Sequence, residues 1–475
     1  VTAAGRLRRD NRGNQPTISG YKQFLIESSP ITYWPLDDGS GSDRGQPAAG
    51  SYMGSSFHRD VGFAVFTFGD GVLGQHLEPT LKLNDTFPAG GFDYMRGHCT
   101  GSDTTPDALA WDFLYRADTQ IAGGTNMATW SLGMTVRRGG GLDSWTITFR
   151  PDGVNDDIAL DLYLDIGTEV VDNLANSAAL AAVNDGELHH VRVHLEDSGA
   201  DVDYAVYVDG TSVLSGTRAT HHLEDPVVVD LQYNRLTGED LLAFGHLIVW
   251  ENAANIPDLA TTASLAHGFA GETAGRRIER LCDEEGITFV SVGDLDATMP
   301  MGVQYEDGLS GQLAECEATD FGILYEPRDA LALAYRTRES LYNQTPVATI
   351  SYSANEIDPP FEPVSDDQYI RNDIFAQRRN GASYRLTKEA GPLAVFDPPN
   401  GVGRYKDEVQ VNCETDDLLA PIAGWILALG TVDEDRYPRL NMLRENKHVV
   451  ANPTLSAALL AVDIGDLIVI EDAAA

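Results

Sequence analysis

The sequence is poor in cysteine and in long apolar runs. Its four cysteines lie far apart and show no metal-ligand spacing: Cys99, Cys282, Cys316 and Cys413. We therefore expect buried free thiols and exclude a disulfide scaffold. No stretch reaches about 18 consecutive apolar residues, the length that a membrane-spanning helix needs, so no membrane anchor is expected.

Basic residues are also scarce. The chain has 33 Lys and Arg against 72 Asp and Glu, which gives a formal net charge of −39. A surface of this sign repels a phosphate backbone, so nucleic acid is not expected as a partner. The acidic excess occurs in both halves of the chain, as expected for the solvated surfaces of folded domains.

Signatures of catalysis are absent as well. The sequence contains no HExxH, no GxSxG and no glycine-rich phosphate loop. We therefore predict that the protein is not an enzyme and has no catalytic residues and no metal ligands. The pairs His189-His190 and His221-His222 would point to opposite faces of a strand, so each pair is expected to be one core-edge and one solvent histidine.

One acidic loop is a candidate for calcium. The segment from Asp37 to Asp43 combines carboxylates with small residues, and oxygen ligands of this kind can hold Ca²⁺. The order of residues does not match an EF-hand loop, so we expect a plain acidic turn and no cofactor, with calcium as the alternative.

From residue 21 to about 250 the sequence is typical of β-strands. Strand candidates cover 144–149, 158–164, 190–195, 227–231 and 242–250, with turn clusters between them. The run 202–208 leads into Asp209-Gly210, which is a hairpin signal. Many short strands at such intervals, with no helical pattern between them, predict an all-β sandwich.

The pattern changes near residue 256 to that of an α+β region. Helices are expected near 256–267, 272–285, 310–320 and 416–429, and paired strands at 322–325 with 331–336 and at 375–379 with 383–386. Helical spacing in 272–285 predicts that Ile278 and Leu281 are buried and that Arg277 is among the residues outside.

Four segments resemble, in order, the landmarks of laminin-G-like, concanavalin-like jelly rolls. They are PITYWPLDDGSG at 30–41, GELHHVRV at 186–193, AVYVDGT at 205–211 and GHLIVWENA at 245–253. Leu188 stands where the family usually has Trp. The resemblance implies a jelly-roll sandwich over 21–268, with Trp34, Tyr207 and Trp250 buried between its two sheets.

A second set of segments resembles minor tail proteins of actinobacterial tailed phages. They are RLRR at 6–9, HGFAGETAGRRIERL at 267–281, GILYEPRD at 322–329 and RYPRL at 436–440. The resemblance implies a tail-tip, or baseplate, hub with an inserted laminin-G-like domain. Residues 1–20 would be a linker from an upstream hub segment, 21–268 the jelly roll, and 269–475 an α+β tail-hub-like region.

The same resemblance implies a location and partners. The protein would belong to the virion, at the phage tail tip, as a homotrimer in contact with other tail and baseplate proteins. The jelly roll would face the host cell wall and could bind its polysaccharide through aromatic and polar groups. Candidate glycan-facing aromatics are Phe92, Tyr94 and Trp111, with core packing as the alternative for each.

Other functions stay open on the sequence alone. The jelly roll could be a spacer without a ligand, or a contact to neighbouring proteins. The chain could also be a secreted glycan hydrolase or an adhesin that carries a lectin-like module.

Overall fold

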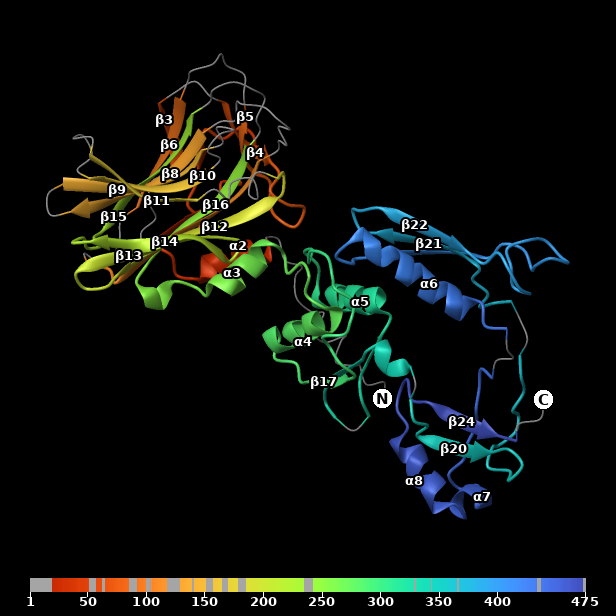
Figure 1. Cartoon of the computed structure of the whole chain (residues 1–475). Helices are drawn as coiled ribbons and strands as arrows, with labels where there is room; N and C mark the ends of the chain where they lie inside the picture. Colours follow the sequence, from red (N-terminus) through yellow and green to blue (C-terminus); the bar gives the residue numbers. More distant parts are fainter. Residues whose placement is uncertain are drawn as a thin grey trace. The chain divides into compact units, whose positions relative to one another are not determined.

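The computed structural model describes most of the chain in two compact units (Figure 1). The described residues are 19–50, 57–61, 65–84, 92–99, 103, 105–117, 129–138, 141–150, 157–164, 170–177, 185–234, 242–328, 330–342, 344–364, 367–433 and 437–472. The first unit runs to Gly268 and the second begins at Phe269.

The first unit is built on two antiparallel sheets. The first sheet has the strand order β14 (Thr211–Ala219), β13 (Asp201–Val208), β12 (Leu188–Asp197), β7 (Ala108–Ala117), β16 (Leu242–Glu251), β5 (Thr80–Asn84) and β4 (Val65–Gly71), and β1 (Thr32–Trp34) also pairs with β16. The second sheet has the order β11 (Val170–Ser177), β10 (Asp157–Leu164), β9 (Gly141–Arg150), β8 (Thr129–Arg138), β15 (Pro226–Asn234), β6 (Phe92–His98), β3 (Phe57–Val61) and β2 (Arg44–Gly45).

These strands confirm the β-rich reading of the sequence. The candidates at 144–149, 158–164, 190–195, 227–231 and 242–250 all lie within or at the ends of β9, β10, β12, β15 and β16. The turn at Asp209-Gly210 joins β13 to β14, and both turn residues have positive φ. That conformation suits Asp-Gly and explains why the hairpin forms there.

The core of the sandwich is formed by the side chains that alternate inward from both sheets. It is a single cluster that includes Trp34, Trp111, Phe113, Trp145 and Phe149, all fully buried. Alternation along a strand places every second side chain in this layer.

Of the three residues expected in the core between the sheets, only one lies there. Trp34 is in the sandwich core as expected. Tyr207 is only partly buried, because its neighbours Val206 and Val208 point inward. Trp250 is fully buried, but it lies in a separate cluster on the outer side of the first sheet. The family landmarks therefore located the strands correctly, but the expectation that Tyr207 and Trp250 are buried between the two sheets is wrong.

Two short helices cover the outer side of the first sheet. They are α2 (Gly20–Glu27) and α3 (Leu259–Ala266), and they pack on strand residues that include Trp250. Each helix begins at a residue whose side chain accepts a hydrogen bond from a backbone amide of the first turn. Ser19 accepts from the Lys22 amide, and Asp258 accepts from the Thr261 amide. Helix α2 corrects the expectation that no helix lies between residues 21 and 250.

The two ends of this unit meet the same short segment. Ser19 donates a hydrogen bond of 2.7 Å to Glu78, and the His76 ring contacts the Ala266 carbonyl at 2.9 Å. The backbone of Gly268 lies so close to the His76 ring that an added Cβ would be 2.8 Å from it. Residues 19 and 268 are therefore brought together by 76–78.

A buried ion-pair network lies beneath these helices. The Asp112 carboxylate accepts hydrogen bonds from Arg192 at 2.8 Å and contacts the His190 ring at 2.9 Å, and all three side chains are buried. Burial alone would raise the pKa of Asp112, but Arg192 and His190 outweigh it and lower that pKa. His189 is also buried, so the expectation of one solvent histidine in this pair is wrong. In the second pair His221 is buried and His222 is exposed, as expected.

The second unit begins with two helices and a small mixed sheet. Helices α4 (Ala274–Glu284) and α5 (Leu309–Asp320) pack against β17 (Phe289–Val292), β19 (Leu333–Arg336) and β18 (Ile323–Tyr325). Ile278 and Leu281 are buried as expected. Arg277 is buried too, because its guanidinium donates to Glu272, to the Phe269 carbonyl and to the Gly302 carbonyl. Backbone carbonyls distant in sequence satisfy this charge, which helical spacing cannot reveal.

Two further layers complete the second unit. Helix α6 (Leu419–Gly430), preceded by the 3-10 turn η4 (Asp416–Leu418), packs on one side of the sheet β22 (Ser383–Thr387), β21 (Asp373–Arg378) and β23 (Lys406–Val411). The parallel pair β20 (Ala348–Ser351) and β24 (Ile468–Glu471) packs with α7 (Lys447–Val450) and α8 (Pro453–Ala461). Short 3-10 turns η2 (Ala253–Asn255) and η3 (Glu339–Leu341) lie in the connections.

The expectation about the cysteines is confirmed. All four cysteines are free and buried. Among the described residues, no helix combines the length and the apolar character that crossing a membrane requires.

Candidate functional site

The outer side of the second sandwich sheet is polar. In β8, Leu132 and Met134 point into the core, so Ser131, Gly133 and Thr135 lie on the outer side. The same alternation in β9, β10, β15 and β6 places hydroxyl, carboxyl, amide and guanidinium groups there. The two described helices of this unit lie on the other sheet (Figure 1). We call this polar side the second-sheet face.

A row of residues crosses the second-sheet face on five adjacent strands. Cross-strand pairing joins Asp161 to Thr146, Thr146 to Gly133, Gly133 to Asp230, and Asp230 to Arg96. Arg96 donates two hydrogen bonds to the Asp230 carboxylate, at 2.6 and 2.8 Å. This paired arrangement fixes both side chains in one orientation.

Glycine occupies the middle position of the row. A Cβ at Gly133 would lie 3.0 Å from the Thr146 hydroxyl and 3.2 Å from the Ser144 hydroxyl. Those two hydroxyls are 3.3 Å apart. Because Gly133 has no side chain, the two hydroxyls can lie over its backbone, between the two carboxylates of the row.

Two further rows flank the first. They contain Tyr163, Ser144 and Thr135 on one side, and Thr148, Ser131 and Gln232 on the other. Tyr163 is 36% exposed, which makes it an accessible aromatic ring on this face. Asp161 and Thr135 are buried, whereas the other polar residues of the three rows are at least partly exposed. Their hydroxyl, carboxylate and guanidinium groups can donate to and accept from a ligand rich in hydroxyl groups.

Of the three aromatic residues expected from the sequence, only Trp111 has a described side chain. Trp111 is fully buried in the sandwich core, so it has no surface on which a sugar could stack, and it is removed from the candidates. Phe92 and Tyr94 belong to β6, but their side chains lie outside the described residues. Tyr163 was missed, although alternation within 158–164 would have placed it opposite the buried Leu160 and Leu162.

The acidic loop expected to be a turn shows no cation cage. The carboxylate of Asp37 pairs with Lys22, that of Asp38 accepts from the Gln46 amide at 3.1 Å, and that of Asp43 pairs with Arg44. Within the described residues, no three ligating side chains are grouped so that they could hold a metal ion. We therefore derive no calcium site from this loop.

A histidine–aspartate cluster lies at one end of the sandwich. The Asp209 carboxylate contacts the His189 ring at 2.7 Å and the His267 ring at 2.8 Å, and His189 also contacts Asp185 at 3.0 Å. Burial opposes protonation of His189, but its hydrogen bonds to Asp209 and Asp185 outweigh burial and raise its pKa. The pKa of Asp209 is held well below its usual range, despite its burial, by the two histidines and the His190 amide.

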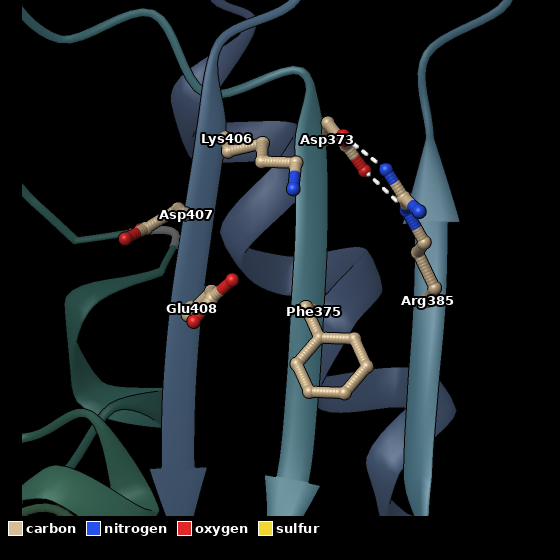
Figure 2. A pocket seen from close by; sticks show the side chains of 6 residues that line it. All are labelled: Asp373, Phe375, Arg385, Lys406, Asp407 and Glu408. Carbon is tan, nitrogen blue, oxygen red and sulfur yellow. Dashed lines mark hydrogen bonds and ion pairs between the residues drawn. The ribbon is translucent and has the colours of Figure 1, made fainter.

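The second unit carries a separate polar hollow of about 200 Å³. It lies on the side of β21, β22 and β23 that α6 does not cover. Figure 2 shows the lining side chains: Asp373 and Phe375 from the central strand, Arg385 on one side, and Lys406, Asp407 and Glu408 on the other.

The Asp373 carboxylate is the fixed centre of this hollow. It is buried and accepts from Arg385 at 2.8 and 2.6 Å and from Arg404 at 2.6 Å. The hydrogen bonds from the two arginines lower the pKa of Asp373 to about 2. Asp373 therefore carries a negative charge over the whole physiological range and holds both guanidinium groups in place.

The comparisons with known proteins give weak structural likenesses. No family model matches the sequence, and no curated protein matches it. The binding domain of botulinum neurotoxin DC, solved in complex with rat synaptotagmin II, has a TM-score of 0.34 at 12% identity over 52% of this chain. The chain spans about half of that structure, 54%.

Two smaller structures are covered more fully. The Emp46p carbohydrate recognition domain has a TM-score of 0.26 at 9% identity, over 36% of this chain and 83% of the other. The Bacillus licheniformis β-glucanase has a TM-score of 0.26 at 14% identity, over 46% of this chain and 96% of the other. Likenesses of this size carry no functional argument, and the two-sheet architecture rests on the strand pairings.

Proposed function

We propose that the chain is a non-enzymatic component of the tail tip of an actinobacterial phage and that its sandwich binds host cell-wall polysaccharide. In this proposal the protein belongs to the virion, forms a homotrimeric hub and contacts other tail and baseplate proteins. The second-sheet face carries the proposal for the sandwich, and the segment order around 267–281 and 322–329 motivates the tail-tip role.

The chemistry of the second-sheet face supports sugar binding. Sugars offer hydroxyl groups that donate and accept, together with apolar C–H faces. Thr146, Ser144 and the Arg96–Asp230 pair supply matching polar groups, and Tyr163 supplies an exposed ring. A few convergent polar groups beside an aromatic surface are typical of small-molecule sites.

The spacing of the two acids in the row favours binding over hydrolysis. Asp161 and Asp230 are separated by three strand spacings, which is about 14 Å at about 4.8 Å per spacing. Glycoside hydrolases place their two carboxyl groups about 5–10 Å apart. Asp230 is also held by Arg96, so these two acids do not form such a pair.

The surface of the second unit supports an assembly role. Of the 18 large apolar side chains that are exposed among the described residues, 15 lie in the second unit. Helix α6 has no polar side chain, and Leu429 on its outer side is 57% exposed. Apolar surface of this kind marks protein–protein contacts, and a helix that is apolar all round is normally covered.

Binding of purified polysaccharide tests the proposal. The whole chain should sediment with purified actinobacterial cell-wall polysaccharide, and Tyr163→Ala should weaken that binding about tenfold, since a central aromatic contact is worth more than about 1 kcal/mol. Tyr207→Ala removes a partly exposed tyrosine from the other sheet and should leave binding unchanged.

Two results would contradict the proposal. Equal binding of the polysaccharide by wild type and Tyr163→Ala would show that the second-sheet face is not the binding site. Release of reducing sugar from the polysaccharide would show that the protein hydrolyses it, which contradicts a non-enzymatic role. The hub role is tested separately by the oligomeric state, since a chain that stays monomeric at all concentrations would contradict the homotrimer.

A further inference from the structure

We propose that the hollow on β21, β22 and β23 binds a sugar that carries one carboxylate. This site lies in the second unit and does not depend on the proposed function of the sandwich. It is built by alternate residues of three adjacent strands (Figure 2).

The strand pairing explains how the hollow forms. Ile374 and Ala376 of β21 pack against α6, so Asp373 and Phe375 lie on the opposite, uncovered side. Phe375 is paired with Arg385 on β22 and with Glu408 on β23, whereas Asp373 is paired with Lys406. The Phe375 ring is therefore flanked by a cation on one strand and an anion on the other.

Several groups in the hollow are available to a ligand. Lys406 and Glu408 are exposed and make no hydrogen bond or ion pair with the described residues. The bonds of Arg385 to Asp373 use its Nε and Nη2 atoms, which leaves Nη1 as a donor. The hollow thus offers donors from Lys406 and Arg385, acceptors from Glu408, and the partly exposed ring of Phe375.

The charge of the cluster selects the ligand. Three cations, Arg385, Arg404 and Lys406, face two anions, Asp373 and Glu408, while Asp407 is paired with Arg371 at 2.7 Å. The cluster therefore has one surplus positive charge and matches one negative charge on a ligand. A doubly charged phosphate would also meet the Glu408 carboxylate and be repelled.

The remaining contacts select a sugar ring. A hydroxyl of the ligand can donate to Glu408 while the apolar side of the ring lies over Phe375. A hollow of about 200 Å³ has room for one ring of this size and not for an extended chain. A simple uronic acid satisfies all of these requirements at once.

Calorimetric titration of the whole chain with sodium glucuronate, at constant ionic strength, tests the inference. We expect saturable binding that is at least tenfold tighter than that of glucose or of glucose 6-phosphate. Lys406→Met should weaken glucuronate binding at least tenfold, because it removes the surplus charge and keeps the length of the side chain. Lys447→Met makes the same exchange at an exposed site on α7, away from the hollow, and should bind like wild type.

The outcomes separate this inference from the function of the sandwich. Tyr163→Ala should weaken polysaccharide binding and leave glucuronate binding unchanged, so either idea can fail alone. Absence of saturable glucuronate binding, equal binding of glucose, tighter binding of glucose 6-phosphate, or wild-type binding by folded Lys406→Met would each overturn the site. Thermal unfolding checks that the variant is folded.

Discussion

The two units of the chain bury their apolar side chains in different ways. The sandwich gathers side chains from strands of both sheets into one large cluster, with a second cluster beneath α2 and α3. The second unit divides its apolar residues among three small clusters, around α4 and α5, beneath α6, and between β20 and α8. Among the described residues, it also holds most of the large apolar side chains that are exposed. The sandwich therefore places its apolar side chains mainly in one core, whereas the second unit leaves more of its described apolar side chains exposed.

The most severe test of this contrast is to remove the sandwich. Deleting residues 20–265 and joining the ends should abolish polysaccharide binding and leave the second unit folded, because its three clusters contain no residue of the sandwich. Circular dichroism and thermal unfolding of the remaining chain measure this. Loss of the second unit's cooperative unfolding would show that the two units depend on each other.

Core truncation gives the next largest effect. Trp111→Ala should destabilise the sandwich by about 3–5 kcal/mol, because a large side chain in a close-packed core is lost. Ile422→Ala beneath α6 is the matched change in the second unit. In scanning calorimetry each variant should lower the temperature of one unfolding transition and leave that of the other unchanged. A shift of both transitions in either variant would contradict the separation of the cores.

The histidine–aspartate cluster predicts a smaller, pH-dependent effect. The pKa of His189 is raised in the folded chain. Its contribution to the free energy of unfolding is therefore complete below its unfolded pKa of about 6.5, and it is lost as pH rises through the folded pKa. His189→Gln should therefore lower the free energy of unfolding by about 1 kcal/mol at pH 5 and by less at pH 8. This figure is already reduced because Asp185 and Asp209 are partly exposed, so that water screens their charges. Urea unfolding of the sandwich at both pH values measures this, and a larger cost at pH 8 would reverse the sign of the argument.

The smallest effect on folding is expected at α6. Leu429→Ser changes an exposed side chain, so the free energy of unfolding should change by no more than about 0.5 kcal/mol. Self-association, measured by sedimentation velocity, should nevertheless weaken if this apolar surface is covered by another copy. A clear loss of stability with unchanged association would place Leu429 in the folded core of the chain instead.

Local signals in the sequence predicted only part of the elements. Alternation and turn residues located β9, β10, β12, β15 and β16, and the apolar run at 416–429 located α6. Helix α8 was missed, although Asn452 before Pro453 is a start signal that the structure uses. Helix α2 is only eight residues long, and a pattern of two turns is too short to stand out from strands.

The environment of individual side chains was harder to predict. Trp111 was left open between a rim and the core, one histidine of the pair 189–190 was expected in solvent, and Arg277 was expected on a helix surface, yet all of these side chains are buried. Trp111 meets residues of other strands, His190 meets Asp112, and Arg277 meets carbonyls of two loops. The hollow around Asp373 likewise needs three strands drawn from 373–411. Contacts between distant segments decide these cases, and one sequence carries no record of them.

The meeting of residues 19 and 268 at segment 76–78 has a consequence for how such a molecule can evolve. Because the sandwich starts and finishes at one place, another body of unrelated sequence can take its position without altering the chain on either side. The ligand that the molecule recognises could then change by exchange of the first unit alone, while the second unit stays the same.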